Sequence, residues 1–202
     1  MAKRIRILLY KTPKFKLKYL VNWLISIRTL SKYSHCEVWE ADEDGEFFKM
    51  HQGTQGNVEC SDGPNGTCHA TITLPIYEWS FLGTCYTSTM RGEANGTVKR
   101  DASKVLDHPE HWDYIEVEVE AYQQMMLYMN NQVENNKGYS KWDILKFISP
   151  WHFADNKRNI CSEFVNNALF FGLVIKGFGI VSPAKVYKKL KKLGYETKSL
   201  KG

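Results

Sequence analysis

The sequence predicts an α+β fold in which a small antiparallel sheet packs against a helix that begins at Cys161. Three observations lead to this prediction. Alternating runs typical of half-buried strands lie at residues 4–10, 34–40 and 114–119. Apolar residues recur every three or four positions after the first and third of these runs, as in helices. Turn-rich segments separate further short β-like runs. We expect a single domain over residues 1–202.

The elements of the first half follow from local signals. The first strand leads into a helix that opens at Pro13, because proline suits the first turn of a helix. The second strand is followed by Asp44-Gly45, which predicts a tight turn into a partner strand near residues 46–50. Turn residues then dominate, so we expect a loop-rich insertion at about residues 53–109.

Four helices are expected in the second half of the chain. They cover about residues 121–134, 142–148, 161–171 and 183–193. Ser182-Pro183 is a strong start signal for the last helix, and Gly194 is a typical residue for its end.

The charge pattern argues against a nucleic-acid partner. The net charge is +5, but seven of the first 18 residues and seven of the last 18 are Lys or Arg. The segment between these ends carries more acidic than basic residues. A nucleic-acid-binding domain usually has a continuous basic face, so we expect no such function. The basic termini are expected to be solvated, and contact with a membrane surface is the alternative.

The five cysteines predict free thiols. Their number is odd and the N-terminus does not resemble a secretory signal, so we expect a cytoplasmic protein with reduced cysteines. A zinc site is a weak alternative, because the candidate ligands lack the closely spaced cysteine pair of structural zinc sites. Those candidates are Cys60, Cys68, His69 and Cys85. We therefore expect no metal and no cofactor.

Cys161 is the strongest candidate for catalysis. A polar loop gives way at this residue to an apolar-periodic helix. A thiol in the first turn of a helix lies near unpaired N–H groups and the positive end of the helix dipole, which favour the thiolate. The same N–H groups can hold an oxyanion. The alternative is a small core residue on the apolar face of the helix.

His35 is the candidate base for Cys161. It lies within the second strand, and Glu37 lies two residues further on, so both side chains leave the same face of the sheet. Glu37 can therefore orient the imidazole, as the third member of a catalytic triad does. His51, just past the next expected strand, is the competing third member. A polar pair on a strand surface is the non-catalytic alternative.

These motifs resemble one protein family. The chain resembles the circularly permuted papain-like cysteine hydrolases, and among them the NlpC-related, YiiX-type amidases. The segments that carry this resemblance are YSHCEVW, HWDYIEVEV, GYSKWDILKF, NICSEFVNNALFFGL and SPAKVYKKL. The family includes bacterial and phage-encoded members, so the host cytoplasm or the virion is the expected location if this protein is phage-encoded. The histidine strand precedes the cysteine helix in that family, as it does here. The G-x-x-Y-D motif of the family is matched only in part, because Ser140 follows Tyr139.

The resemblance implies a thiol hydrolase with a Cys161–His35–Glu37 triad. Its implied substrates are amides or esters, with the peptides of peptidoglycan as the leading class. Two alternatives remain open. One is a lipid acyl hydrolase or acyltransferase, as in the distantly related lecithin:retinol acyltransferases. The other is a non-catalytic module that binds a host protein on the same scaffold.

Overall fold

The computed structural model describes residues 2–13, 20–52, 56–58, 72–74, 77–89, 95–135 and 160–201. Its strands are β1 (Lys3–Lys11), β2 (Tyr33–Glu40), β3 (Phe48–Gln52), β4 (Gly56–Val58), β5 (Ile72–Leu74), β6 (Tyr77–Phe81), β7 (Thr84–Thr89), β8 (Gly96–Asp101), β9 (Trp112–Val119) and β10 (Thr197–Ser199). Its α-helices are α1 (Leu20–Thr29), α2 (Ala102–Val105), α3 (Tyr122–Glu134), α5 (Cys161–Phe171) and α6 (Pro183–Lys192). The protein therefore combines helices with antiparallel strands.

Six strands form the main sheet in the order β10-β9-β1-β2-β7-β8, and each neighbouring pair is antiparallel. β1 lies inside the sheet, with Ile7 opposite Val38 of β2 and Ile115 of β9. The strand is buried from Ile5 to Tyr10, because both faces of the sheet are covered at this position. This pairing and burial therefore hold the backbone of β2, and with it the directions of its side chains, in a fixed position.

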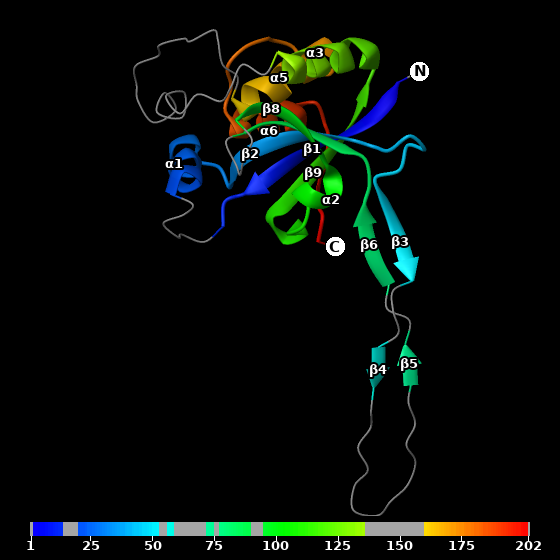
Figure 1. Ribbon diagram of the computed structural model, residues 1–202. Coiled ribbons are helices and arrows are strands. Elements are labelled where there is room, and N and C mark those ends of the chain that lie inside the picture. The colour runs from blue at the N-terminus through cyan, green and yellow to red at the C-terminus, as the bar shows by residue number, and fades with distance from the viewer. Residues whose placement is uncertain are drawn as a thin grey trace, which may run out of the picture.

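The two faces of the main sheet are covered by different elements. Helices α3, α5 and α6 lie on one face (Figure 1). They contribute a group of fully buried apolar side chains: Met125, Met129, Phe164, Val165, Ala168, Leu169, Val186 and Leu190. The opposite face carries a second apolar cluster around Trp39, with α2 beside it. Burial of each large side chain contributes about 1.5–3 kcal/mol to folding, which fixes α5 firmly against β2.

Three of the expected helices are confirmed. α3, α5 and α6 cover the predicted ranges to within about a residue at each end. The side chain of Ser182 caps α6 by accepting a hydrogen bond from the backbone N–H of Lys185 at 3.2 Å. The helix expected at residues 142–148 lies outside the described residues. The helix expected to open at Pro13 is seen as α1, and residues 14–19 also lie outside the described part.

The prediction that β2 pairs with the next strand along the chain is wrong. β3 pairs with β6 in a separate two-stranded sheet, while the neighbour of β2 is β7. Gly83 makes this arrangement possible where β7 enters the sheet. Its φ is +83°, and a Cβ at this position would clash with the backbone oxygen of Glu40. Only glycine fits such a close approach with a positive φ.

Part of the predicted insertion at residues 53–109 belongs to the main sheet. β7 and β8 are sheet strands, and Cys85 and Ala102 are fully buried. The turn-rich sequence concealed this because each strand is only six residues long. Of the described strands, β3 to β6 lie outside the main sheet and project from it as an arm (Figure 1).

The arm can be shortened without loss of the fold. Lys49 of β3 lies opposite Ser80 of β6, so replacing residues 50–79 by Asn-Gly creates a two-residue hairpin. The free energy of unfolding should change by less than about 2 kcal/mol, because an isolated two-stranded hairpin is only marginally stable. Urea unfolding measures this change. Deletion of residues 53–109 gives the contrasting variant: it removes β7 and β8, so it should prevent folding, and a folded product would contradict their place in the sheet.

Candidate active site

The main sheet opens between β2 and β7, next to His35. The described pairing of these two strands ends at Val38 opposite Tyr86, whereas β1 pairs with β2 as far as Tyr33. Beyond Tyr86, β7 continues beside β8. Helix α5 packs against both β2 and β7. Its first residue, Cys161, contacts β2 at this opening.

The start of α5 leaves backbone donors beside Cys161. Ile160 precedes the helix in an extended conformation, with φ −95° and ψ 157°, and its side chain makes no capping hydrogen bond. The first N–H groups of a helix have no acceptor within the helix. The hydroxyl of Ser162 donates a hydrogen bond to the carbonyl oxygen of Val181 at 2.6 Å, which holds this first turn in place.

The sulfur of Cys161 lies at the edge of β2 between two neighbouring residues. The groups that interact with it and lower its pKa are the Cys36 thiol, the His35 ring and the Cys36 backbone N–H. Successive side chains of a strand point to opposite faces, so the sulfur is approached from both sides of the sheet. The backbone N–H can reach it because β7 does not pair with β2 at this point.

His35 is held on its other side by Glu37 and Thr87. Its Nε2 lies 2.9 Å from Oε1 of Glu37 and 3.2 Å from Oγ1 of Thr87. A carboxylate only accepts hydrogen bonds, so Nε2 donates to Glu37. The ring also packs edge-on against Trp112, with 6.3 Å between ring centroids. The site is therefore a Cys–His–Glu chain of contacts in a buried environment.

The electrostatics of the site favour an ion pair. Hydrogen bonding from Cys36, followed by the charge and hydrogen bond of His35, holds the pKa of Cys161 well below its usual value, although burial opposes this. Burial by itself lowers the pKa of His35, but the Cys161 thiolate and then Glu37 raise it to about 9. Burial, together with the adjacent thiolate, raises the pKa of Cys36, which keeps its proton. Both shifts favour a thiolate on Cys161 and an imidazolium on His35.

This ion pair predicts an unusual pH profile for alkylation. At pH 6 iodoacetamide should label Cys161 about 10-fold or more faster than an ordinary thiol, which is under about 1% ionised at that pH. The rate should stay nearly constant up to pH 8. In His35→Ala the rate at pH 6 should fall and then climb with pH, because the imidazolium no longer lowers the thiol pKa. Intact-mass spectra with peptide mapping measure both rates.

Cys85 is the internal control for this experiment. Burial raises the pKa of its thiol, so it should react slowly at every pH tested. Equal and slow labelling of all the cysteines, with the pH slope of an ordinary thiol, would contradict the ion pair.

The structure separates the other candidates from this site. His51, the competing third member of the triad, lies exposed on β3 in the projecting arm, whereas Glu37 contacts His35 directly. Of the four candidate zinc ligands, Cys85 lies buried in β7. The other three, Cys60, Cys68 and His69, lie outside the described residues. Among the described residues, no group of three or more His, Cys, Asp or Glu side chains is arranged to hold a metal ion.

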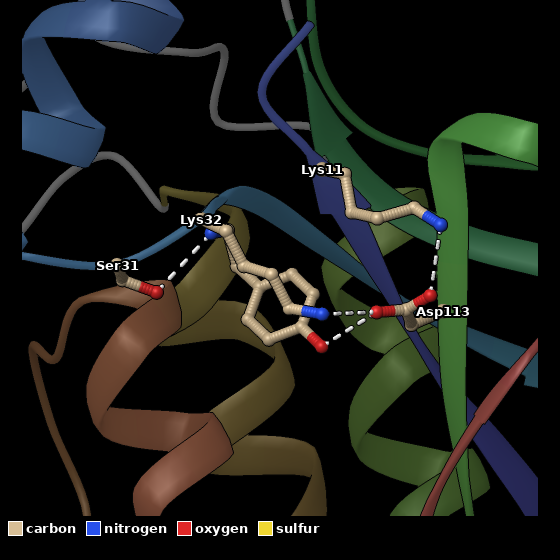
Figure 2. A network of polar contacts seen from close by, with 5 residues as sticks. Lys11, Ser31, Lys32 and Asp113 are labelled. Atoms are coloured by element: carbon tan, nitrogen blue, oxygen red, sulfur yellow. Dashed lines mark hydrogen bonds and ion pairs between the residues drawn. The ribbon is translucent and has the colours of Figure 1, made fainter.

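Asp113 ties together the strand ends beside the site (Figure 2). Its Oδ1 lies 2.9 Å from Nζ of Lys11, and its Oδ2 lies 2.9 Å from Nζ of Lys32. The hydroxyl of Tyr33 also donates to Oδ2, at 2.7 Å. The network therefore joins β9 to the end of β1 and the start of β2, two residues before His35. Burial by itself raises the pKa of Asp113, but the hydrogen bonds from the lysines and the tyrosine hold it below its usual value.

Asp113→Asn should lower the free energy of unfolding at pH 7 by about 1–3 kcal/mol, because the partners of a nearly buried carboxylate lose its charge. A carboxyl with a lowered pKa stabilises the fold above its unfolded value of about 3.9 and loses this effect as the pH falls through the folded value. Urea unfolding should therefore show that the difference in free energy of unfolding between wild type and Asp113→Asn decreases towards pH 3. Asp107→Asn, at an exposed position, is the control. A difference in free energy of unfolding that does not vary with pH would indicate that the substitution acts through packing and not through the lost charge.

Sequence reasoning missed three residues of this region: Cys36, Thr87 and Asp113. Cys36 carried one usable signal, because it adjoins His35 in the chain. Thr87 reaches His35 only through the pairing of β2 with β7, and Asp113 meets its lysines only through the pairing of β1 with β9. Patterns within a short stretch of sequence cannot predict these contacts.

No protein-family model, curated protein or solved structure matches the chain. Within the described ranges, no helix has the length and apolar character needed to cross a membrane. The function must therefore be inferred from the residues and their geometry.

Proposed function

We propose that the protein is a thiol hydrolase in which Cys161 is the nucleophile, His35 the general base and acid, and Glu37 the residue that orients His35. The observation that carries this proposal is the simultaneous contact of the His35 ring with Cys161 and Glu37. A nucleophile, a base and an orienting carboxylate in one chain of hydrogen bonds form the arrangement used for acyl transfer. Burial strengthens the electrostatic interactions among them.

The reaction would proceed through an acyl-enzyme. The Cys161 thiolate attacks the carbonyl carbon, and N–H groups at the start of α5 stabilise the negative charge on the carbonyl oxygen. The His35 imidazolium then protonates the leaving amine or alcohol as the C–N or C–O bond breaks. Neutral His35 takes a proton from water, whose oxygen attacks the thioester and releases the acid. These steps use the side chains of Cys161 and His35, backbone N–H groups of α5 and water.

The motif resemblance favours peptide amides as substrates and a permuted papain-like arrangement as the detailed fold. The histidine strand precedes the cysteine helix in the chain, and α5 packs by its N-terminus against that strand. Among amides, the peptides of peptidoglycan are the leading class because the most similar motifs belong to amidases of that kind.

An acyl-enzyme trap tests the proposal. p-Nitrophenyl acetate should release a burst of nitrophenol equal to the enzyme concentration and leave an acetyl group on Cys161, detected by intact mass and peptide mapping. Purified peptidoglycan stem peptides then test the substrate class, with cleavage followed by mass spectrometry. Absence of a burst and of any acetylated Cys161 would contradict the hydrolase and favour a binding module on the same scaffold.

An exposed apolar stripe supports a lipid acyl hydrolase as the second candidate. Leu20, Trp23 and Ile27 share one side of α1, and Leu30 follows with 90% of its surface exposed. Short helices with such a stripe bind at membrane interfaces. Basic residues in both termini would add attraction to anionic lipids.

Vesicle sedimentation separates the two candidates. Phosphatidylglycerol vesicles should bind the wild type if lipid is the substrate, and Leu30→Asp should reduce this binding several-fold. Leu127→Asp, at an exposed position on α3, is the matched control. Cleavage of stem peptides without vesicle binding would leave the amidase as the remaining candidate.

A further inference from the structure

A second thiol touches the proposed nucleophile but has no part in the acyl-transfer steps. Cys36 lies in β2, and Cys161 is the first residue of α5, which packs against β2. Both are buried, free cysteines, and the Cys36 thiol is the group that contributes most to the lowered pKa of Cys161. Two neighbouring thiols, of which one is shifted towards its thiolate form, provide the arrangement from which a disulfide arises after oxidation.

We infer that Cys36 and Cys161 form an oxidative modification site, in which Cys36 is the resolving thiol for a Cys161 oxidised by peroxide. This inference rests on Cys161 being the reactive thiolate of the proposed function. The ligand class is hydrogen peroxide or a small hydroperoxide, whose size suits a buried site in which only 5% of the surface of Cys161 is exposed.

The chemistry balances in two steps. In the first step the Cys161 thiolate attacks one peroxide oxygen, so that an S–O bond forms and the O–O bond breaks. The departing hydroxide takes the proton of the His35 imidazolium and leaves as water. In the second step the Cys36 sulfur attacks the Cys161 sulfur, so that an S–S bond forms and the S–O bond breaks. The second hydroxide leaves as water with the Cys36 proton. Two thiol sulfurs are oxidised to a disulfide, and one peroxide is reduced to two waters.

The surroundings of the two sulfurs support this order of events. While Cys161 carries its negative charge, that charge helps Cys36 to retain its proton and to remain a hydrogen-bond donor. Burial is the main cause of the raised pKa of Cys36, and conversion of Cys161 to the neutral sulfenic acid removes the charge that raises it further, so Cys36 then loses its proton more readily as it attacks. Among the described strands, the pairing of β2 with β7 ends at Val38, so Cys36 is not paired with β7.

Disulfide formation would switch the site off reversibly. The thiolate that attacks the substrate would be consumed, and a reducing thiol would restore it. Without Cys36, the sulfenic acid would be oxidised further to sulfinic and sulfonic acids, which simple thiols do not reduce.

Peroxide treatment of the full-length protein tests this inference. Wild type and Cys36→Ser are exposed to submillimolar hydrogen peroxide, and remaining thiols are blocked with N-ethylmaleimide in denaturant before digestion. In the wild type we expect a linked peptide pair joining Cys36 to Cys161 and a loss of at least about 90% of fast iodoacetamide labelling. Dithiothreitol should restore the labelling. In Cys36→Ser we expect no link, a gain of two or three oxygen atoms on Cys161 and no recovery.

Cys85→Ala is the matched control, because Cys85 is buried in the cluster on the opposite face of the sheet and should not affect the link. Equal overoxidation of Cys161 in the wild type and in Cys36→Ser, with no linked pair, would overturn the inference. A Cys161 disulfide to any other cysteine would also overturn it. The readout is the mass of linked peptides and needs no turnover. Its failure in a protein that forms the acyl-enzyme would therefore refute the resolving role alone, whereas absence of an acyl-enzyme would refute the hydrolase.

Discussion

If the proposed hydrolase is correct, replacing Cys161 by serine is expected to abolish the acyl-enzyme burst and to lower kcat/KM for p-nitrophenyl acetate by about 10⁴-fold or more, since loss of a nucleophile removes the action of a whole triad. A serine hydroxyl stays protonated at neutral pH, so the preformed thiolate that contacts His35 is lost. Ester hydrolysis followed at saturating and limiting substrate concentrations measures the change.

Cys85→Ser is the control for this substitution. Cys85 is also a fully buried cysteine, in β7 opposite Trp39 of β2, so any effect of a serine on folding alone should appear there as well. Retention of more than about a tenth of the activity in Cys161→Ser, with the protein still folded, would remove Cys161 from the role of nucleophile.

Replacing Glu37 by glutamine is expected to lower turnover by a factor on the order of 10²–10⁴, by comparison with other triads in which the carboxylate was replaced. Glutamine keeps the shape and one hydrogen-bond acceptor but loses the charge that stabilises the His35 imidazolium. The pKa of His35 should fall as a result, because Glu37 is one of the groups that raise it. The alkaline limb of the activity profile should then move to lower pH in the variant.

His51→Ala is the comparison that decides the third member of the triad. His51 lies on the exposed side of the arm, so this substitution should cost less than about tenfold. A larger loss in His51→Ala than in Glu37→Gln would transfer the orienting role to His51. An unchanged pH profile in Glu37→Gln would leave Glu37 as a structural carboxylate.

The sequence predicted most strands of the sheet individually, but not which strands are neighbours. The alternation of residues 4–10 and 114–119 identified β1 and β9, but not that they are neighbours. The local turn at Asp44-Gly45 suggested a hairpin with β2, and the structure shows that the next strand leaves the sheet instead. Strand neighbours are chosen by burial and backbone pairing across the whole chain, which no short segment encodes.

Local sequence was enough to establish which side chains share a face or a helix end. The two-residue period of a strand places His35 and Glu37 on one face, and the change from polar loop to periodic helix places Cys161 at a helix start. Both follow from backbone geometry over a few residues, so they need no knowledge of the fold.

The contacts among these side chains were settled by packing. Cys161 reaches the edge of β2, Cys36 donates to it, and Thr87 supports His35. These contacts depend on where β7 stops pairing with β2 and on the docking of α5 against both strands. They could not be predicted because they join segments more than 50 residues apart in the chain, whose approach is fixed by burial and strand pairing in the folded protein.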